Sequence, residues 1–154
     1  MYMKERISRA ITSILEAAVY NKSKSDKHGE VFTPFELVNE MVDKIPSDVW
    51  CDKTKTFFDP CVGLGQFPIV LVERLFNGLK DVIPNEADRL KHIVENQIFM
   101  GEFQQKSAEF TKELFEFGMG LKVNLHVGDS LTMPEDFFDL SFEERAAKYP
   151  TQVV

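Results

Sequence analysis

The sequence predicts an α/β fold in which a parallel sheet carries helices on its faces. Short apolar runs that indicate strands alternate along the chain with amphipathic segments that indicate helices, and this alternation is typical of strand–helix–strand units. Acids and glycines follow directly on the apolar runs, where parallel sheets bind ligands beyond the carboxyl ends of their strands. The length of 154 residues suits one domain with one core.

The first half of the chain contains periodic apolar segments that predict three helices and one strand. The helices have apolar residues three and four positions apart, and prolines or glycines mark their ends. The expected elements are, in order, a helix over 3–20, a polar loop over 21–29, a helix from near Pro34 that ends before Pro46, a buried strand over 54–58, and a helix over 66–76 that Asn77 and Gly78 end.

The second half continues the alternation. Phe110, Leu114 and Phe117 share one helical face, and Gly118 follows as a C-terminal cap. The expected elements are, in order, a helix over 86–96, a short strand over 97–100, a helix over 104–117, a strand over 122–127, a helical turn over 142–148, and the opening of another strand over 151–154.

Composition and charge exclude several classes of protein. Hydrophobic residues make up 44% of the chain and charged residues 28%, as in ordinary globular domains. No run of about 18 apolar residues occurs, and the charged N-terminus lacks an apolar signal core. We therefore expect a cytoplasmic protein with no membrane contact. Cys51 and Cys61 are expected to be reduced thiols, and the three histidines do not cluster as metal ligands.

The net charge of −7 is unevenly spread. Residues 1–28 carry six basic and three acidic side chains, whereas residues 129–154 carry two basic and six acidic ones. An acidic body argues against strong nonspecific DNA binding by this chain alone. The basic N-terminal segment that contains Lys22, Lys24 and Lys27 is either a solvated loop or a contact for phosphate.

The stretch FFDPCVGLGQF at residues 57–67 is the strongest candidate for a ligand site. An apolar strand ends at Asp59, and Gly63 and Gly65 can adopt positive φ and let the backbone approach a ligand closely. The Asp59 carboxylate can accept hydrogen bonds from an ammonium group or from loop amides. Taken alone, the pattern also fits any tight turn from a strand into a helix.

Two further acids follow later strands. Glu102 can accept both hydroxyls of a ribose, and the adjacent Phe103 can lie against a flat base; the alternative is an exposed acid followed by a core phenylalanine. Asp129, next to Ser130, can accept a hydrogen bond from an exocyclic amine. The alternative for Asp129 is a turn in which its side chain bonds its own backbone.

The stretch GEVFTP at residues 29–34 precedes the second helix. Thr33 and Glu36, with Pro34 at the first helical position, form the pattern of a capping box. Helix N-terminal amides and a hydroxyl would also suit a carboxylate ligand.

The chain resembles the cofactor half of N6-adenine DNA methyltransferases over roughly residues 29–131. The resemblance lies in four segments that occur in this order: GEVFTP, FFDPCVGLGQF, IFMGEF and VGDSL. The likeness is to the group whose cofactor motifs precede the catalytic motif, as in restriction-modification and phage enzymes. It implies a Rossmann-like class I methyltransferase sheet, cut at about the fourth strand, with an N-terminal helical extension. Residues 1–28 would form a helix and basic loop, and residues 29–154 an incomplete domain that binds S-adenosylmethionine.

The resemblance also implies roles for individual residues. Phe32, Thr33 and Pro34 would hold the methionine carboxylate. Around the glycine turn, the amino-acid portion would contact Asp59, Pro60, Cys61, Gly63, Gly65 and Phe67. Glu102 would hold the ribose hydroxyls and Phe103 the adenine ring, whereas Asp129 with Ser130 would hold the adenine amine. Cys61 and Gln66 depart from the typical residues at their positions, and Val62 is bulkier than usual.

The family's catalytic tetrapeptide, Asn/Asp-Pro-Pro-Tyr/Phe, does not occur in this sequence. In the family it contacts the flipped adenine. The resemblance therefore implies a chain that is inactive alone and acts on DNA within a longer enzyme or with a second chain that supplies the motif. Two alternatives remain. One is a stand-alone protein that transfers no methyl group and binds either S-adenosylmethionine or a methyltransferase partner. The other is a domain with no ligand.

Overall fold

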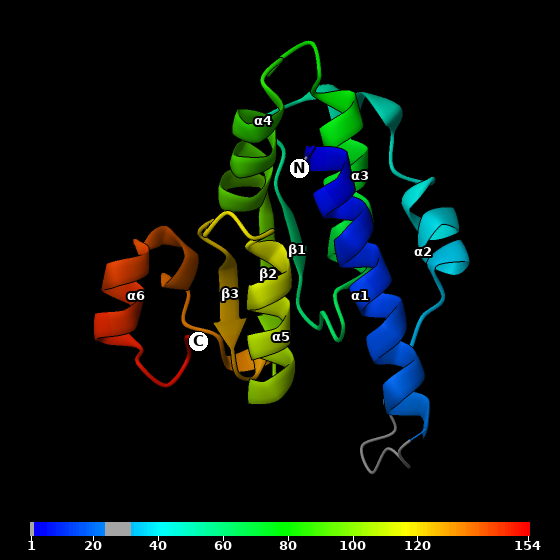
Figure 1. The fold of residues 1–154 in the computed structure, drawn as a ribbon. Helices are drawn as coiled ribbons and strands as arrows, with labels where there is room; N and C mark the ends of the chain where they lie inside the picture. The colour runs from blue at the N-terminus through cyan, green and yellow to red at the C-terminus, as the bar shows by residue number, and fades with distance from the viewer. Residues whose placement is uncertain (1, 24–31) are drawn as a thin grey trace.

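The computed structural model describes residues 2–23 and 32–154, which form a parallel sheet with helices packed around it (Figure 1). Within this part of the chain the sheet has three strands in the order β1–β2–β3, and both pairs are parallel. This architecture confirms the α/β prediction and is compatible with a Rossmann-like fold. The elements are, in chain order, α1 (Met3–Ser23), α2 (Phe35–Val42), η1 (Ser47–Cys51), β1 (Phe57–Asp59), α3 (Gln66–Gly78), α4 (Glu86–His92), a π-helical turn η2 (Ile93–Gln97), β2 (Ile98–Glu102), α5 (Gln105–Phe115), β3 (Asn124–Val127), η3 (Ser130–Thr132), η4 (Phe137–Asp139) and α6 (Phe142–Lys148).

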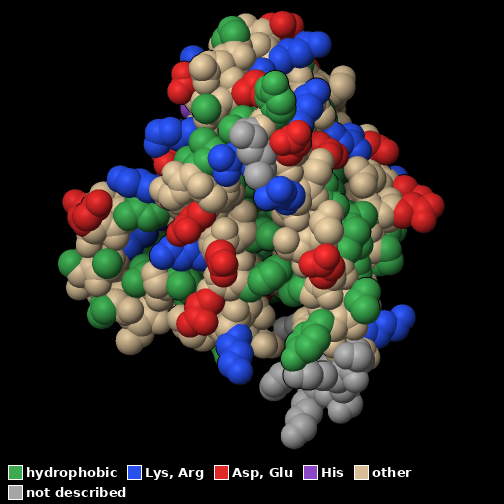
Figure 2. All heavy atoms as spheres, viewed as in Figure 1, with side chains coloured by type: hydrophobic (Ala, Val, Ile, Leu, Met, Phe, Trp, Pro, Cys, Tyr) green, Lys and Arg blue, Asp and Glu red, His purple; other side chains and the backbone are tan. Residues whose placement is uncertain are grey.

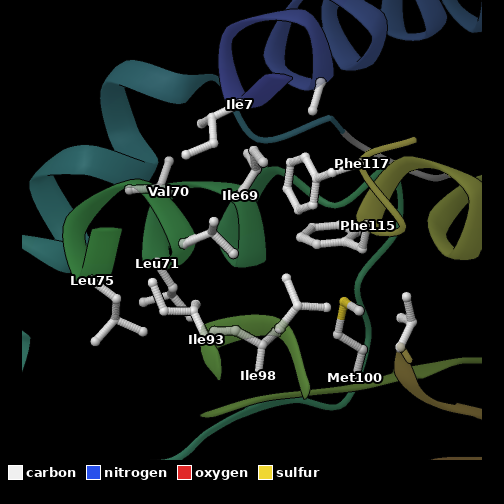
Figure 3. Packing of buried hydrophobic residues seen from close by; sticks show 14 of the residues in the cluster. Ile7, Ile69, Val70, Leu71, Leu75, Ile93, Ile98, Met100, Phe115 and Phe117 are labelled. Carbon is white, nitrogen blue, oxygen red and sulfur yellow. The ribbon is translucent and has the colours of Figure 1, made fainter. Parts of the chain in front are cut away.

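The main core lies between the sheet and the helices α1, α3 and α5. Alternate side chains of β2, Ile98 and Met100, point from the sheet toward α3 and α5 (Figure 3). Ile69 and Leu75 of α3 and Phe115 of α5 belong to the same core and are fully buried. The strands are thus held from one face, and their carboxyl ends are free to carry loops.

Helix α1 belongs to this same core. Ile7, Ala10 and Ile14 on its inner face are buried, with exposed fractions of 5% or less. The helix predicted over 3–20 is confirmed and runs three residues beyond its expected end. The remaining residues of the expected loop, 24–29, lie outside the described residues, and the boundary between 28 and 29 stays a prediction.

The second face of the sheet is covered by the segment 137–149. Polar and apolar residues alternate along β3, yet all four of its residues are buried. Asn124 accepts a hydrogen bond from Arg145 Nη1 at 3.1 Å, and the His126 ring meets Phe137 edge-on. The polar face of β3 is therefore an interior surface.

The capping box predicted at the start of α2 is wrong. The first helical hydrogen bond runs from Val38 N to Pro34 O, and no side chain caps this end of the helix. Pro34 has an extended ψ of 146°, so helical backbone begins only at Phe35. Thr33 therefore lies one residue too early to act as the cap.

The strand limits also differ from those expected. Residues 54–56 do not join β1, because β2 begins at Ile98, opposite Phe57, and the π-helical turn before it offers no strand to pair with. The strand expected over 151–154 is absent from the described residues. Gln152 O instead accepts a hydrogen bond from Val127 N at 3.0 Å, so this segment lies beside the outer edge of β3.

The other predicted helices and strands are confirmed, with ends shifted by a few residues. Sequence reasoning missed the helical turn η1, in which Trp50 stacks on Phe57 with ring centroids 5.5 Å apart. Within the described ranges, no helix is both long enough and apolar enough to cross a bilayer.

Replacing Leu75 by alanine should lower the free energy of unfolding by about 2–5 kcal/mol, because the side chain is fully buried and leaves a cavity. The matched control is Leu131→Ala, since Leu131 is 94% exposed and its loss should change stability by less than about 0.5 kcal/mol. Urea unfolding of both variants measures the difference. Equal effects would contradict the packing described here.

Candidate functional site

The candidate site lies at the carboxyl ends of the three strands. Because the strands are parallel and in register, Asp59, Glu102 and the loop after Val127 emerge at the same edge of the sheet. The loops after β1, β2 and β3 are called here the first, second and third loops; they cover residues 60–65, 103–104 and 128–130, the last of which is also the first residue of η3. The structure thus brings together three acids that are far apart in the sequence.

Glu102 joins all three loops. Its Oε2 accepts a hydrogen bond from Gly63 N, and its Oε1 accepts one from Gln104 N, both at 3.0 Å. Its backbone oxygen accepts a hydrogen bond from Gly128 N at 2.9 Å. Glu102 is only 5% exposed, and the two amides compensate its buried charge. Each carboxylate oxygen keeps a second lone pair that can accept a ligand hydroxyl.

Gly101 allows the first and third loops to touch. Ser130 Oγ donates a hydrogen bond to Pro60 O at 2.6 Å, directly over this glycine. A Cβ on residue 101 would come within 2.5 Å of Ser130 Oγ and 2.9 Å of Pro60 O. Ser130, predicted to contact the ligand, therefore uses its hydroxyl to fasten the third loop to the first.

The glycine turn has the backbone that its sequence predicted. Gly63 and Gly65 have φ of 57° and 93°, in the region that favours glycine. Gly65 packs against the ring of Phe115, which lies 3.0 Å from where its Cβ would be, whereas the space beside Gly63 is nearly open. Gly65 thus serves packing, and Gly63 leaves room for close approach.

Asp59 is held at the start of this turn. Its Oδ1 accepts a hydrogen bond from Cys61 N at 3.0 Å, and Oδ2 has no hydrogen-bond partner in the part of the chain that the structure describes. Loss of solvent raises the pKa of Asp59, and the Cys61 amide opposes this only in part. A partly desolvated carboxylate with a free oxygen is suited to a cationic donor.

The other predicted site residues differ in how available they are. Phe103 is 75% exposed beside Glu102, as a stacking surface requires. Asp129 is exposed, and its Oδ1 accepts a hydrogen bond from Leu131 N at 2.9 Å, the turn named as its alternative role. Phe67 is half-buried against the core, and Pro60 and Cys61 are exposed.

The structure does not bring residues 32–34 into the same network. Phe32 packs on Phe35, with ring centroids 6.2 Å apart, and on the core. Among the described residues, no hydrogen bond joins Thr33 to any of the three loops. Their contact with a ligand stays a prediction.

A cavity with a volume of about 490 Å³ lies between α1 and α5, and Arg6, Arg9, Phe110 and Glu113 are among its lining residues. None of the predicted site residues lines it. Within residues 2–23 and 32–154, His, Cys, Asp and Glu side chains form no group that could hold a metal ion.

The chain is similar to a protein of Mycoplasma pneumoniae named as an uncharacterized adenine-specific methylase, with 38% identity over 73 residues. The match covers 46% of this chain and 17% of that protein, so the chain spans a minor part of its relative's length. No family model matches the sequence. This likeness supports methyltransferase as the class of protein to which the chain is related.

Replacing Asp59 by asparagine should stabilise the ligand-free protein at neutral pH. A raised pKa means that the folded state holds the proton more tightly than the unfolded state, so the wild type loses stability as pH rises from the ordinary value of 3.8 through the folded pKa. Asparagine can still accept the Cys61 bond but does not ionise. The stability gain of Asp59→Asn, measured by urea unfolding, should grow over this pH range and then level off.

A stability gain that is the same at every pH would contradict the raised pKa of Asp59. Asp139→Asn serves as the control, because it removes an exposed acid that lies outside the three loops. Asp59→Asn should show the larger dependence of stability on pH.

Proposed function

We propose that this chain is the S-adenosylmethionine-binding portion of a class I, N6-adenine-specific DNA methyltransferase of the restriction-modification or phage type. The observation that carries the proposal is the hydrogen-bonded network that joins the Asp59 turn, Glu102 and the Asp129 loop at one edge of a parallel sheet. The methylase likeness of the sequence supports the same class.

The residues present fit the chemistry of the cofactor. Asp59 offers a free carboxylate oxygen toward a cationic amino group. Glu102 has lone pairs for two ribose hydroxyls, and the exposed Phe103 ring offers a flat face to adenine. The positive φ at Gly63 keeps a side chain out of the space where the ligand approaches. When bound, the cofactor would supply an activated methyl group.

Transfer of that methyl group would require groups that this sequence lacks. The flipped adenine must be held by an Asn/Asp-Pro-Pro-Tyr/Phe segment, which is absent from the 154 residues. We therefore propose that DNA and a further segment or second chain complete the site. Figure 2 shows basic and acidic side chains interspersed over the viewed face, so this face is not a basic surface of the kind that binds DNA by itself.

Calorimetry with S-adenosylmethionine tests the proposal. The wild type should bind it, and the ligand should raise the melting midpoint. Asp59→Ala should remove most of this ligand-induced shift, because it deletes the acceptor for the amino group. Asp139→Ala, which alters an exposed acid outside the three loops, should retain the shift. Failure of the wild type to bind would contradict the proposed function.

A second assay tests the proposed inactivity of the chain alone. With tritiated S-adenosylmethionine and adenine-containing DNA, this chain should transfer no methyl group. Addition of a chain that carries the Asn-Pro-Pro-Tyr segment should restore transfer. Turnover by the chain alone would show that the catalytic groups lie among its own residues and would overturn this part of the proposal.

A further inference from the structure

Gln66, the first residue of α3, contains a buried carbonyl oxygen without a hydrogen-bond donor. The residue is 7% exposed, and its Oε1 has no partner within the described residues. A buried acceptor that loses water and gains no donor lowers stability, so such groups are rare in native proteins and need an explanation.

The oxygen borders the glycine turn. A Cβ built on Gly63 would have Gln66 Oε1 as its nearest contact, at 3.9 Å, and meets no other described group within 4 Å apart from its chain neighbours. Gln66 Oε1 therefore faces the space left by the absent side chain of Gly63. The Gly63 amide itself is already bonded to Glu102 Oε2, so it cannot serve as the missing donor.

Packing alone does not explain a glutamine at this position. The residues that follow in the first turns of α3, Pro68, Ile69 and Val70, are apolar and buried. Gln97, another buried glutamine with an unpaired Oε1, differs because its Nε2 donates hydrogen bonds to Asp52 O and Lys55 O. Gln66 has no side-chain hydrogen bond in the described part of the chain.

The position of Gln66 indicates which kind of hydrogen-bond donor its Oε1 would accept from. It lies at the end of the turn that begins at Asp59, whose free carboxylate oxygen suits a cationic donor. Both ends of this turn thus carry an acceptor, and a primary ammonium is a group with several N–H donors. Gly63 has no Cβ, and the nearly open space beside it is where that group can approach.

We propose that Gln66 Oε1 accepts a hydrogen bond from the amino group of the methionine portion of S-adenosylmethionine, and that Gln66 thereby selects ligands with an amino group at this position. The inference rests on the proposed function. It adds a specificity-determining side chain to the site, and it explains the unpaired acceptor as a group whose partner is the ligand.

The test compares two ligands in two proteins. Gln66→Met preserves the length of the side chain and its helix-forming tendency but removes the acceptor. The ligands are S-adenosylhomocysteine and its analogue with hydrogen in place of the amino group. By calorimetry, Gln66→Met should weaken binding of S-adenosylhomocysteine about tenfold and change binding of the analogue by less than about twofold.

A second measurement needs no ligand. Because methionine removes an unpaired buried acceptor, the ligand-free melting midpoint of Gln66→Met should rise by about 2–4 °C. Thr111→Val is the matched control: Thr111 is fully buried on α5, and its hydroxyl is also unpaired among the described residues. This variant should raise the midpoint similarly and leave both affinities unchanged.

Each outcome has a defined meaning. Equal loss of affinity for both ligands, or a lower ligand-free midpoint in Gln66→Met, would show that Gln66 shapes the turn and would overturn the inference alone. The same holds if the wild type binds both ligands and Gln66→Met changes neither affinity. If the wild type binds neither ligand, the proposed function fails and the inference fails with it.

Discussion

The buried carboxylate of Glu102 is the group on which the arrangement of the loops depends. A charge that is 95% removed from solvent must be compensated by donors, and here the donors are the amides of Gly63 and Gln104. The two amides need the carboxylate in turn, because without Glu102 they would lose their hydrogen-bond acceptor. One side chain thus fixes the first loop, the second loop and, through its backbone, the third.

The first and third loops approach each other closely at Gly101. The contact between Ser130 Oγ and Pro60 O passes where a side chain at 101 would be, and Val62 N donates a hydrogen bond to Gly101 O at 3.0 Å. The third loop is therefore fastened to the first without an intervening side chain. The glycine of the IFMGEF segment acts in the site through its lack of a Cβ.

The second face of the sheet illustrates what a local pattern cannot reveal. Asn124 and His126 alternate with apolar neighbours, a pattern typical of a strand with one solvated face. Asn124 is buried against Arg145, 4% exposed, which donates hydrogen bonds to Asn124 Oδ1, Phe137 O and Phe138 O. His126 is buried against the ring of Phe137. Burial lowers the pKa of Arg145, and aromatic rings surround its guanidinium group.

The sequence by itself determined most of the helices and strands and the order of the candidate site residues, because apolar periodicity and strand-end glycines are local signals. It placed Asp59, Glu102 and Asp129 after successive strands, and the parallel sheet brings them to one edge. Tertiary structure alone decided that Glu102 bonds Gly63, that Thr33 does not cap α2, and that the segment at Gln152 lies beside β3. These outcomes depend on which distant groups meet, and an unpaired atom such as Gln66 Oε1 becomes visible only after its neighbours are placed.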